Sequence, residues 1–296
     1  MKLKPKIDKI QVTENIYGKL DEEKEVLYLR AGSKEGYIAL SKHASYKSHI
    51  IKNNFDTSYI KSIVIEESIA PISGYLMFDE CDKLEKIYNI ENLHTENMSN
   101  MMGMFQNCKS LQEITLDRFD TSNATTMEYM FDGCHSLKEI DVDGFNTGNV
   151  SRMRFMFSAC INITELDLTS FNTQKVKQIN HLVYACKKLS KINLSSFDTK
   201  EIEYMDQIFA SCDNLREIDL YNFDTNKVKS ITYMFAYCKN LNRVNFGEQF
   251  IINENINYNH MFRDCKKDIK IRAKKVTIDA IKQKYTNFTD NNFEEI

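Results

Sequence analysis

The chain has 296 residues, of which 42% are hydrophobic, and it carries a formal net charge of −3, two prolines and nine glycines. This composition argues against a disordered or linker-rich chain, and the near-neutral charge argues against nucleic acid or a membrane surface as the partner. No segment is apolar enough to span a membrane, and no secretory signal with its run of roughly 7–15 apolar residues opens the chain. We therefore expect a water-soluble protein.

Residues 1–80 are predicted to form a small N-terminal α+β cap. Two β-prone runs, 26–30 and 37–41, flank the glycine-containing loop 31–36, which favours a hairpin between them. A third run, 60–68, alternates as a strand does. The cap would cover the apolar end of the repeat array that follows it.

Eight cysteines divide the rest of the chain at nearly constant intervals. Successive members are 26 or 27 residues apart: Cys81, Cys108, Cys134, Cys160, Cys186, Cys212, Cys238 and Cys265. A fixed period of roughly 20–50 residues is the signature of stacked repeats, so residues 81–264 are predicted to be a solenoid. We expect reduced thiols that are buried like small hydrophobes. Disulfides or metal sites are the alternatives, although no C-x-x-C pair supports zinc.

Each repeat has a strand-like half and a helix-like half. The first half reads L-x-x-I-x-L, as in Leu111, Ile114 and Leu116, and its last two apolar side chains point the same way from a short strand. The tripeptide F-[DN]-T follows, and we expect its threonine to cap the next element. In the second half, spacings such as Met153 to Met156 predict a short amphipathic helix whose methionines lie in the core. The fold predicted is an α/β, leucine-rich-repeat-like solenoid of about seven strand-helix repeats.

The repeat consensus L-x-x-I-x-L-x-x-F-[DN]-T-x-x-V-x-x-M-x-x-M-F-x-x-C resembles the bacterial BspA-like leucine-rich-repeat surface-protein family, whose repeats are also known from mycoplasma lipoproteins. The resemblance covers residues 81–264, and residues 60–81 are similar to the stretch that precedes the first repeat in that family. It implies surface display and binding of host or matrix proteins, with no catalytic residues. Family members usually carry an export signal or a lipid attachment, which this chain does not show, so a cytoplasmic location stays open.

Residues 265–296 are predicted to form a C-terminal cap and tail. We expect a closing strand at 268–276, a short helix at 277–285, and a frayed end at 286–296.

The candidate site is a stripe of acidic side chains on the outward positions of the predicted concave strand face. Stacked strands are about 4.8 Å apart, so these carboxylates would form ladders of like charge. A basic protein partner is one interpretation, and a merely solvated face or weak calcium binding are the alternatives. The stripe consists of Glu113, Asp117, Glu139, Asp141, Asp143, Glu165, Asp167, Glu217 and Asp219.

The sequence points to binding and not to catalysis. It contains no nucleotide-binding or hydrolase motif, and its six histidines do not pair at ligand spacing. We therefore expect a monomeric, non-catalytic protein without cofactor or metal. It would bind a host or matrix protein through the strand face, at the cell surface or after secretion. The alternative is an intracellular interaction or effector protein on the same scaffold, because a ladder of free thiols suits a reducing compartment.

Overall fold

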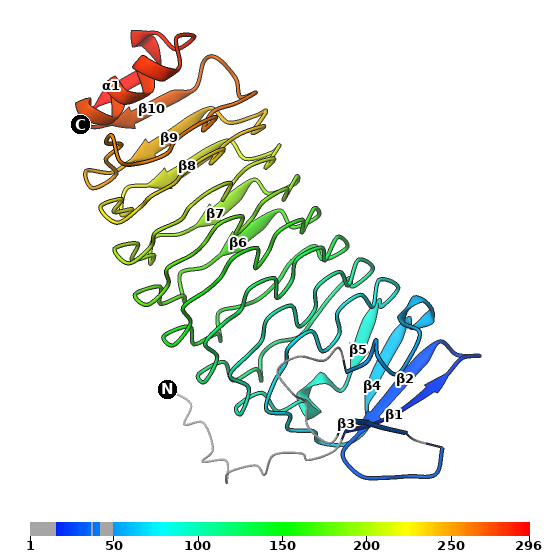
Figure 1. Cartoon of the computed structure of the whole chain (residues 1–296). Helices are drawn as coiled ribbons and strands as arrows, with labels where there is room; N and C mark the ends of the chain where they lie inside the picture. Colours follow the sequence, from blue (N-terminus) through cyan, green and yellow to red (C-terminus); the bar gives the residue numbers. More distant parts are fainter. Residues whose placement is uncertain (1–15, 37, 42–49) are drawn as a thin grey trace.

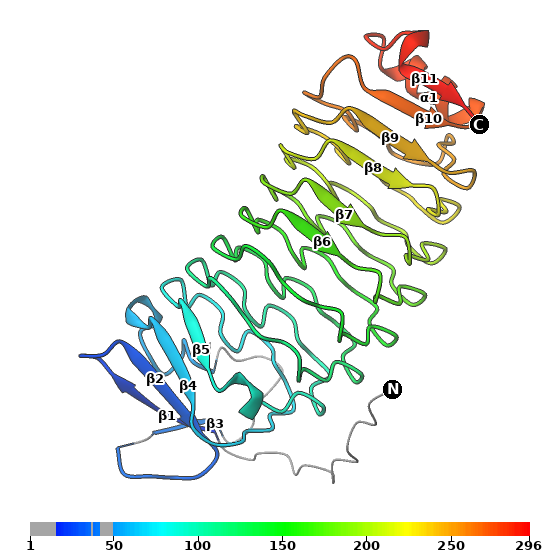
Figure 2. The same ribbon diagram turned by 180° about the vertical axis from the view of Figure 1, so that it is seen from behind.

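The computed structural model describes residues 16–36, 38–41 and 50–296, and it shows a solenoid of coils stacked along one axis (Figure 1). Corresponding residues of successive coils form parallel bridges at intervals of 26 or 27 residues, from Asn100 and Thr126 to Ser230 and Asn257. Seen from behind, the strands from β5 to β10 follow one another along the stack, with the N-terminal strands and helix α1 at opposite ends (Figure 2). The predicted solenoid is thus confirmed.

The N-terminal end of the stack is a five-stranded sheet in the order β3-β1-β2-β4-β5. The strands predicted at 26–30 and 37–41 are present, but β1 lies between them and pairs antiparallel with both. The predicted hairpin is therefore wrong, because the tight turn at 22–25 pairs β2 with β1 instead. The strands are β1 (Ile16–Asp21), β2 (Val26–Arg30), β3 (Ile38–Ser41), β4 (Ser62–Ile65) and β5 (Lys86–Tyr88).

The first half of the coils forms short parallel strands, as predicted, in only part of the array. Strand β6 pairs with β7, and β8, β9, β10 and β11 form a second parallel sheet. The corresponding residues 113–117 and 139–143 lie in no strand, so the prediction is wrong for these two coils. The strands are β6 (Glu165–Asp167), β7 (Lys191–Asn193), β8 (Glu217–Leu220), β9 (Arg243–Phe246), β10 (Lys270–Ala273) and β11 (Phe293–Glu295).

The second half of each coil, predicted as a helix, is a run of turns. The amide of Phe131 donates to the carbonyl of Met156 in the next coil (2.9 Å), whereas the amide of Met130 donates to Met127 three residues back (3.3 Å). A helix would need bonds to the fourth residue back. Two residues four apart have positive φ angles in each coil, as at Tyr129 (60°) and Gly133 (76°). Successive turns thus produce the three-residue spacing that resembles a helix, and α1 (Lys275–Lys284) is the one α-helix within residues 16–36, 38–41 and 50–296.

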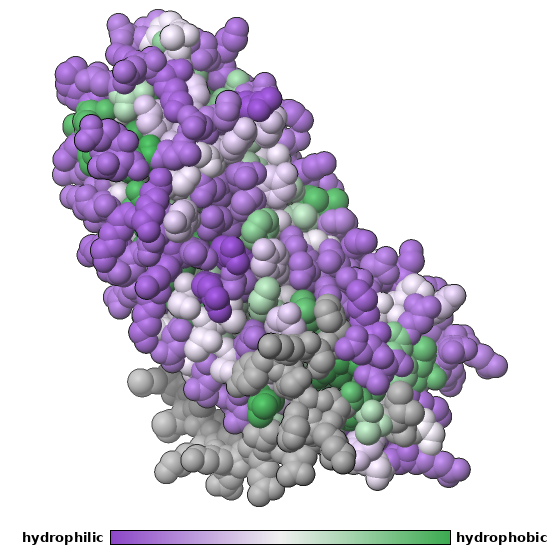
Figure 3. Space-filling model, viewed as in Figure 1, coloured by the Kyte–Doolittle hydropathy of each residue, from purple (hydrophilic) through white to green (hydrophobic). Residues whose placement is uncertain are grey.

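The core is a set of side-chain ladders that run along the stack. Rings of Phe78, Phe105, Phe131 and Phe157 stack at centroid distances of 5.2–5.8 Å. The methionines of the second half, such as Met153, are fully buried, which confirms their predicted place in the core. Figure 3 shows that this view of the coils is mostly hydrophilic, as expected when the apolar residues lie inside.

A buried threonine joins each coil to the next. The hydroxyl of Thr121 donates to the carbonyl of Asn146 (3.1 Å) and accepts from the amide of the same residue (2.7 Å). Local capping, which was predicted for threonine, is done by the preceding residue: Asp120 Oδ1 accepts from the amide of Ser122 (2.9 Å). The threonines of this series are Thr95, Thr121, Thr147, Thr173, Thr199 and Thr225.

The cysteines are free thiols that donate between coils. Cys160 Sγ lies 3.1 Å from the carbonyl oxygen of Phe131, and the same contact recurs along the ladder. All are buried except Cys265, which is half-buried. Burial raises the pKa of the Cys186 thiol to about 12, and that of Cys265 to about 12 as well. The thiolate, which is the reactive form, is therefore scarce at neutral pH.

This burial predicts slow labelling of the native protein by DTNB at pH 8. Cys265 should react first, because it is the least buried thiol, and all eight cysteines should react once guanidinium unfolds the chain. The absorbance of released thionitrobenzoate measures both stages. Rapid release from several thiols of the folded protein would contradict the buried ladder.

The C-terminal end is more ordered than the sequence suggested. The predicted strand and helix are present as β10 and α1. The segment 286–296, expected to fray, forms β11 parallel to β10. It is held by Phe288, which is buried, and by Asn292, whose amide donates to the carbonyls of Lys267 (2.8 Å) and Ile269 (2.9 Å).

The boundaries of the three predicted parts, at residues 80 and 264, remain a prediction. Coil-to-coil hydrogen bonds are already present at Gly74, whose amide donates to Asn100 (2.8 Å), and at Phe78, whose amide donates to Met104 (2.9 Å). The regular stacking therefore reaches into the segment that precedes Cys81.

Candidate strand-face binding site

The structure places all nine predicted acidic side chains at the surface of the strand side of the coils, where each is exposed. They fall into two groups. Glu217 and Asp219 lie beside Arg243 and Asn245 in the register of β8 and β9. The other seven occupy three consecutive coils, and we call them the acidic segment: Glu113, Asp117, Glu139, Asp141, Asp143, Glu165 and Asp167.

Two members of the acidic segment have cationic neighbours. Glu113 pairs with Lys86, and this pairing holds the pKa of the Glu113 carboxyl below its usual range. Glu165 lies 3.9 Å from Lys191. Such exposed pairs contribute about 0–1 kcal/mol each. The segment therefore holds seven carboxyl groups beside two paired lysines.

Some of the aspartates also hold the backbone, a role that the sequence prediction missed. Asp141 Oδ1 accepts from the amide of Asp143 (2.9 Å), and Asp167 Oδ1 accepts from the amide of Thr169 (2.9 Å). The latter bond is the main reason that the pKa of Asp167 is lowered. Asn193 makes the same turn with its amide oxygen. The recurrence of Asp or Asn at this position of the repeat was a signal that could have revealed the turn.

The strand ladder is open where the acidic segment lies. Glu113, Glu139 and Glu165 occupy the same position of three successive coils, and like charges directly opposite one another destabilise strand pairing. Where Lys191 follows Glu165, strands β6 and β7 do pair. Like charge does not explain two other gaps: between β7 and β8, where Lys191 precedes Glu217, and after β5, where Lys86 pairs with Glu113.

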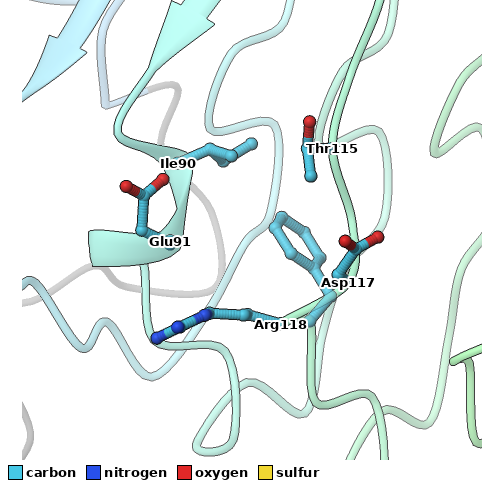
Figure 4. Close-up of a pocket in the computed structure, with 6 residues that line it drawn as sticks. Ile90, Glu91, Thr115, Asp117 and Arg118 are labelled. Carbon is cyan, nitrogen blue, oxygen red and sulfur yellow. The ribbon is translucent and has the colours of Figure 1, made fainter.

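A cavity of about 250 Å³ lies at one edge of the acidic segment. It opens between the 3₁₀ helix Ile90–Asn92 and the following coil. Figure 4 shows the carboxylates of Glu91 and Asp117 on opposite sides of it, with the Arg118 side chain crossing below. Ile90 and Phe119 are buried and supply its apolar lining. The lining residues are Ile90, Glu91, Thr115, Asp117, Arg118 and Phe119.

A second groove, of about 440 Å³, lies at the C-terminal end of the strand face. Here Arg243 and Arg272 both approach Glu294, at 3.7 and 3.4 Å. Asn245 donates to Asp219 at 2.7 Å. Four of the five charged groups of this groove, all except Glu217, have partners within the chain, which distinguishes it from the acidic segment.

The described part of the chain offers neither a metal cluster nor a membrane-spanning helix. Across residues 16–36, 38–41 and 50–296, no three His, Cys, Asp or Glu side chains gather around a common point that could hold a metal ion. Over the same residues, no helix has the length and apolar character needed to cross a bilayer.

The repeats match one family model twice. Residues 73–191 and 157–273 both match the family described as "Mycoplasma protein of unknown function, DUF285". Together the matches span more than half of the chain. The chain belongs to the DUF285 family. This membership confirms the mycoplasma-type repeat that the sequence motif indicated, and the DUF285 match includes all three coils of the acidic segment.

Solved structures similar to this DUF285 protein are bacterial repeat proteins. A leucine-rich repeat protein from Bacteroides ovatus ATCC 8483 is 18% identical, with a TM-score of 0.35, and the match covers 80% of this chain and 66% of that one. A leucine rich cell surface protein from Faecalibacterium prausnitzii A2-165 is 14% identical, with a TM-score of 0.31, and the match covers 94% and 92%. Among curated proteins, none matches. Likenesses this distant carry no argument about function.

Proposed function

We propose that this DUF285 protein is a non-catalytic binding protein whose acidic segment contacts a basic region of a partner protein. One observation supports the proposal most. Seven exposed carboxylates lie on three consecutive coils, and among the described residues only Glu113 and Glu165 of these seven form an ion pair. Such a predominantly negative surface raises the encounter rate with a partner of opposite charge and disfavours acidic partners.

The fold itself does not require this negative charge. Asn193 makes with its amide the same turn that Asp141 and Asp167 make with their carboxylates. Asparagine at those positions would remove repulsion and keep the turn. The extra charge therefore counts against stability, which favours a role in binding over a merely solvated face.

Neutralising the acidic segment tests the proposal. The variant Glu139→Gln, Asp141→Asn, Asp143→Asn, Glu165→Gln keeps the turns and removes four charges. We expect it to bind a short arginine-rich peptide about tenfold more weakly, because four exposed pairs contribute roughly 0.3–0.5 kcal/mol each. Isothermal titration at an ionic strength of about 0.05 M, below the physiological value, reduces screening.

The control removes the same number of charges from exposed sites outside the acidic segment: Glu254→Gln, Asp264→Asn, Asp268→Asn and Glu295→Gln. It should leave the peptide affinity within about twofold of the unaltered protein, because only charges near the binding site contribute strongly. Equal weakening by both variants would show that the affinity depends on the net charge of the protein, and would contradict a specific role of the acidic segment.

The intracellular alternative is supported only by the free thiols, and burial weakens that support. A ladder of reduced cysteines suits a reducing compartment. Thiols that are fully buried, with pKa values raised as at Cys186, also resist oxidation wherever the protein is located. The thiol ladder therefore does not decide between a surface protein and an intracellular one.

A further inference from the structure

The cavity beside Asp117 lies at a junction that lacks a contact found between three later pairs of coils. We count the cysteine of each coil as position 1. In three later coils, the side chain at position 11 donates to a carbonyl of the preceding coil: Ser170 to Val142 (3.2 Å), Ser196 to Leu168 (3.0 Å) and Asn222 to Leu194 (3.2 Å).

Arg118 occupies that position in its coil, and it makes no such bond among the described residues. The preceding coil is also one residue longer, and its 3₁₀ helix Ile90–Asn92 widens the gap. Figure 4 shows Arg118 extending across the gap without filling it. Gly144 holds the same position in the next coil and has no side chain to form this bond, so the missing bond alone does not set this junction apart; the longer preceding coil with its 3₁₀ helix does.

The lining of the cavity suits a long cationic side chain. Its volume of about 250 Å³ is below the roughly 300–1,000 Å³ of sites that take drug-sized ligands. Ile90 and Phe119 provide an apolar interior. Glu91 and Asp117 lie on opposite sides of it, and with Arg118 at the lower edge the lining keeps one formal negative charge. Lysine and arginine combine an aliphatic stem with a charged end, so one side chain could use both features.

We propose that this cavity is a subsite for a single lysine or arginine side chain of the partner, with its stem against Ile90 and Phe119 and its charge between Glu91 and Asp117. The proposal rests on the proposed function, because the partner is the basic protein that the acidic segment would bind. It adds a defined position at which that partner is anchored. The remaining carboxylates of the segment would then orient the partner around the anchor.

The test uses the full chain and three small probes: acetyl-arginine amide, acetyl-lysine amide and the uncharged acetyl-glutamine amide. We expect the two cationic probes to shift the amide NMR signals of residues 90–91 and 115–119 in a saturable way, and the uncharged probe to leave them unchanged. The double variant Glu91→Gln, Asp117→Asn should weaken probe binding about three- to fivefold. The control variant Glu217→Gln, Asp219→Asn lies on the same face but outside the cavity, and it should leave probe binding unchanged.

Failure of the subsite and failure of the proposed function give different results. The subsite would be overturned if the cationic probes shifted the NMR signals near all the carboxylates equally, or if the double variant bound the probes as tightly as the unaltered protein. If the arginine-rich peptide then still binds the unaltered protein more tightly than the four-charge variant, the proposed function stands alone. If neither the peptide nor the cationic probes bind the unaltered protein, both proposals are wrong.

Discussion

Replacing Gly247 by alanine is expected to destabilise the protein by about 3 kcal/mol or more, in the upper range for overpacked sites. A Cβ atom at this position would lie 1.7 Å from the carbonyl oxygen of Tyr221 and 2.4 Å from its carbonyl carbon. Both atoms belong to the backbone of the preceding coil, so no side-chain rotation can relieve the overlap. The coils would have to separate, and the midpoint of urea unfolding measures that change.

Gly144 is the matched control for Gly247. It lies near the equivalent place in an earlier coil, and a Cβ atom there would meet nothing within 4 Å. Gly144→Ala should change the free energy of unfolding by less than about 1 kcal/mol, and can even raise it by restricting the unfolded chain. Equal unfolding midpoints for the two variants would show that the coils are not packed as described.

Replacing Thr173 by valine should destabilise the protein by about 2–4 kcal/mol, although the side chain keeps its shape. The Thr173 hydroxyl donates to the carbonyl of Asp198 (2.8 Å) and accepts from the amide of Asp198 (2.8 Å). Thr173 is buried, so valine would leave two backbone groups of the next coil without a partner. Each unsatisfied group costs about 1–3 kcal/mol.

Thr169 provides the comparison, because it is exposed and only four residues away. Thr169→Val should change stability by less than about 0.5 kcal/mol, as for other surface substitutions. The free energy of unfolding from urea titration, followed by circular dichroism, distinguishes the two. An unchanged free energy of unfolding for Thr173→Val would mean that the threonine ladder does not join the coils.

The sequence was sufficient to predict the repeat, its period and most of its core. The spacing of the cysteines set the register, and the apolar positions such as Leu111, Met153 and Phe157 are buried as that register requires. These predictions are confirmed because burial depends on the side of the chain that a residue faces, and the same positions of every repeat face the core.

The predicted helix was wrong because a three-residue spacing has two causes. In this fold it arises from successive turns, with the alternate amides bonded to the next coil, as for Phe131 and Met156. Hydrogen bonds between coils do not alter the hydrophobic periodicity of the sequence, so the periodicity does not distinguish these turns from a helix. The residues at positive φ gave little warning, since Tyr129, Phe155 and Tyr233 are not residues that favour that conformation.

The candidate site was predicted in its residues but not in its shape. Exposure of the acidic side chains followed from the register. The open strand ladder between β5 and β6 did not, and neither did the cavity at Asp117, because both depend on pairs of residues in different coils. Two signals for the cavity were Arg118, at a position that holds Ser or Asn in three later coils, and the extra residue of the preceding coil.

A charge exchange tests the central claim, that the acidic segment binds a basic partner, most directly. The variant Glu139→Lys, Asp143→Lys, Glu165→Lys reverses three exposed charges and leaves the turn aspartates in place. Titration calorimetry should show the unaltered protein binding an arginine-rich peptide and not a glutamate-rich one, and the variant reversing this preference. Retention of the original preference by a folded variant would contradict the claim.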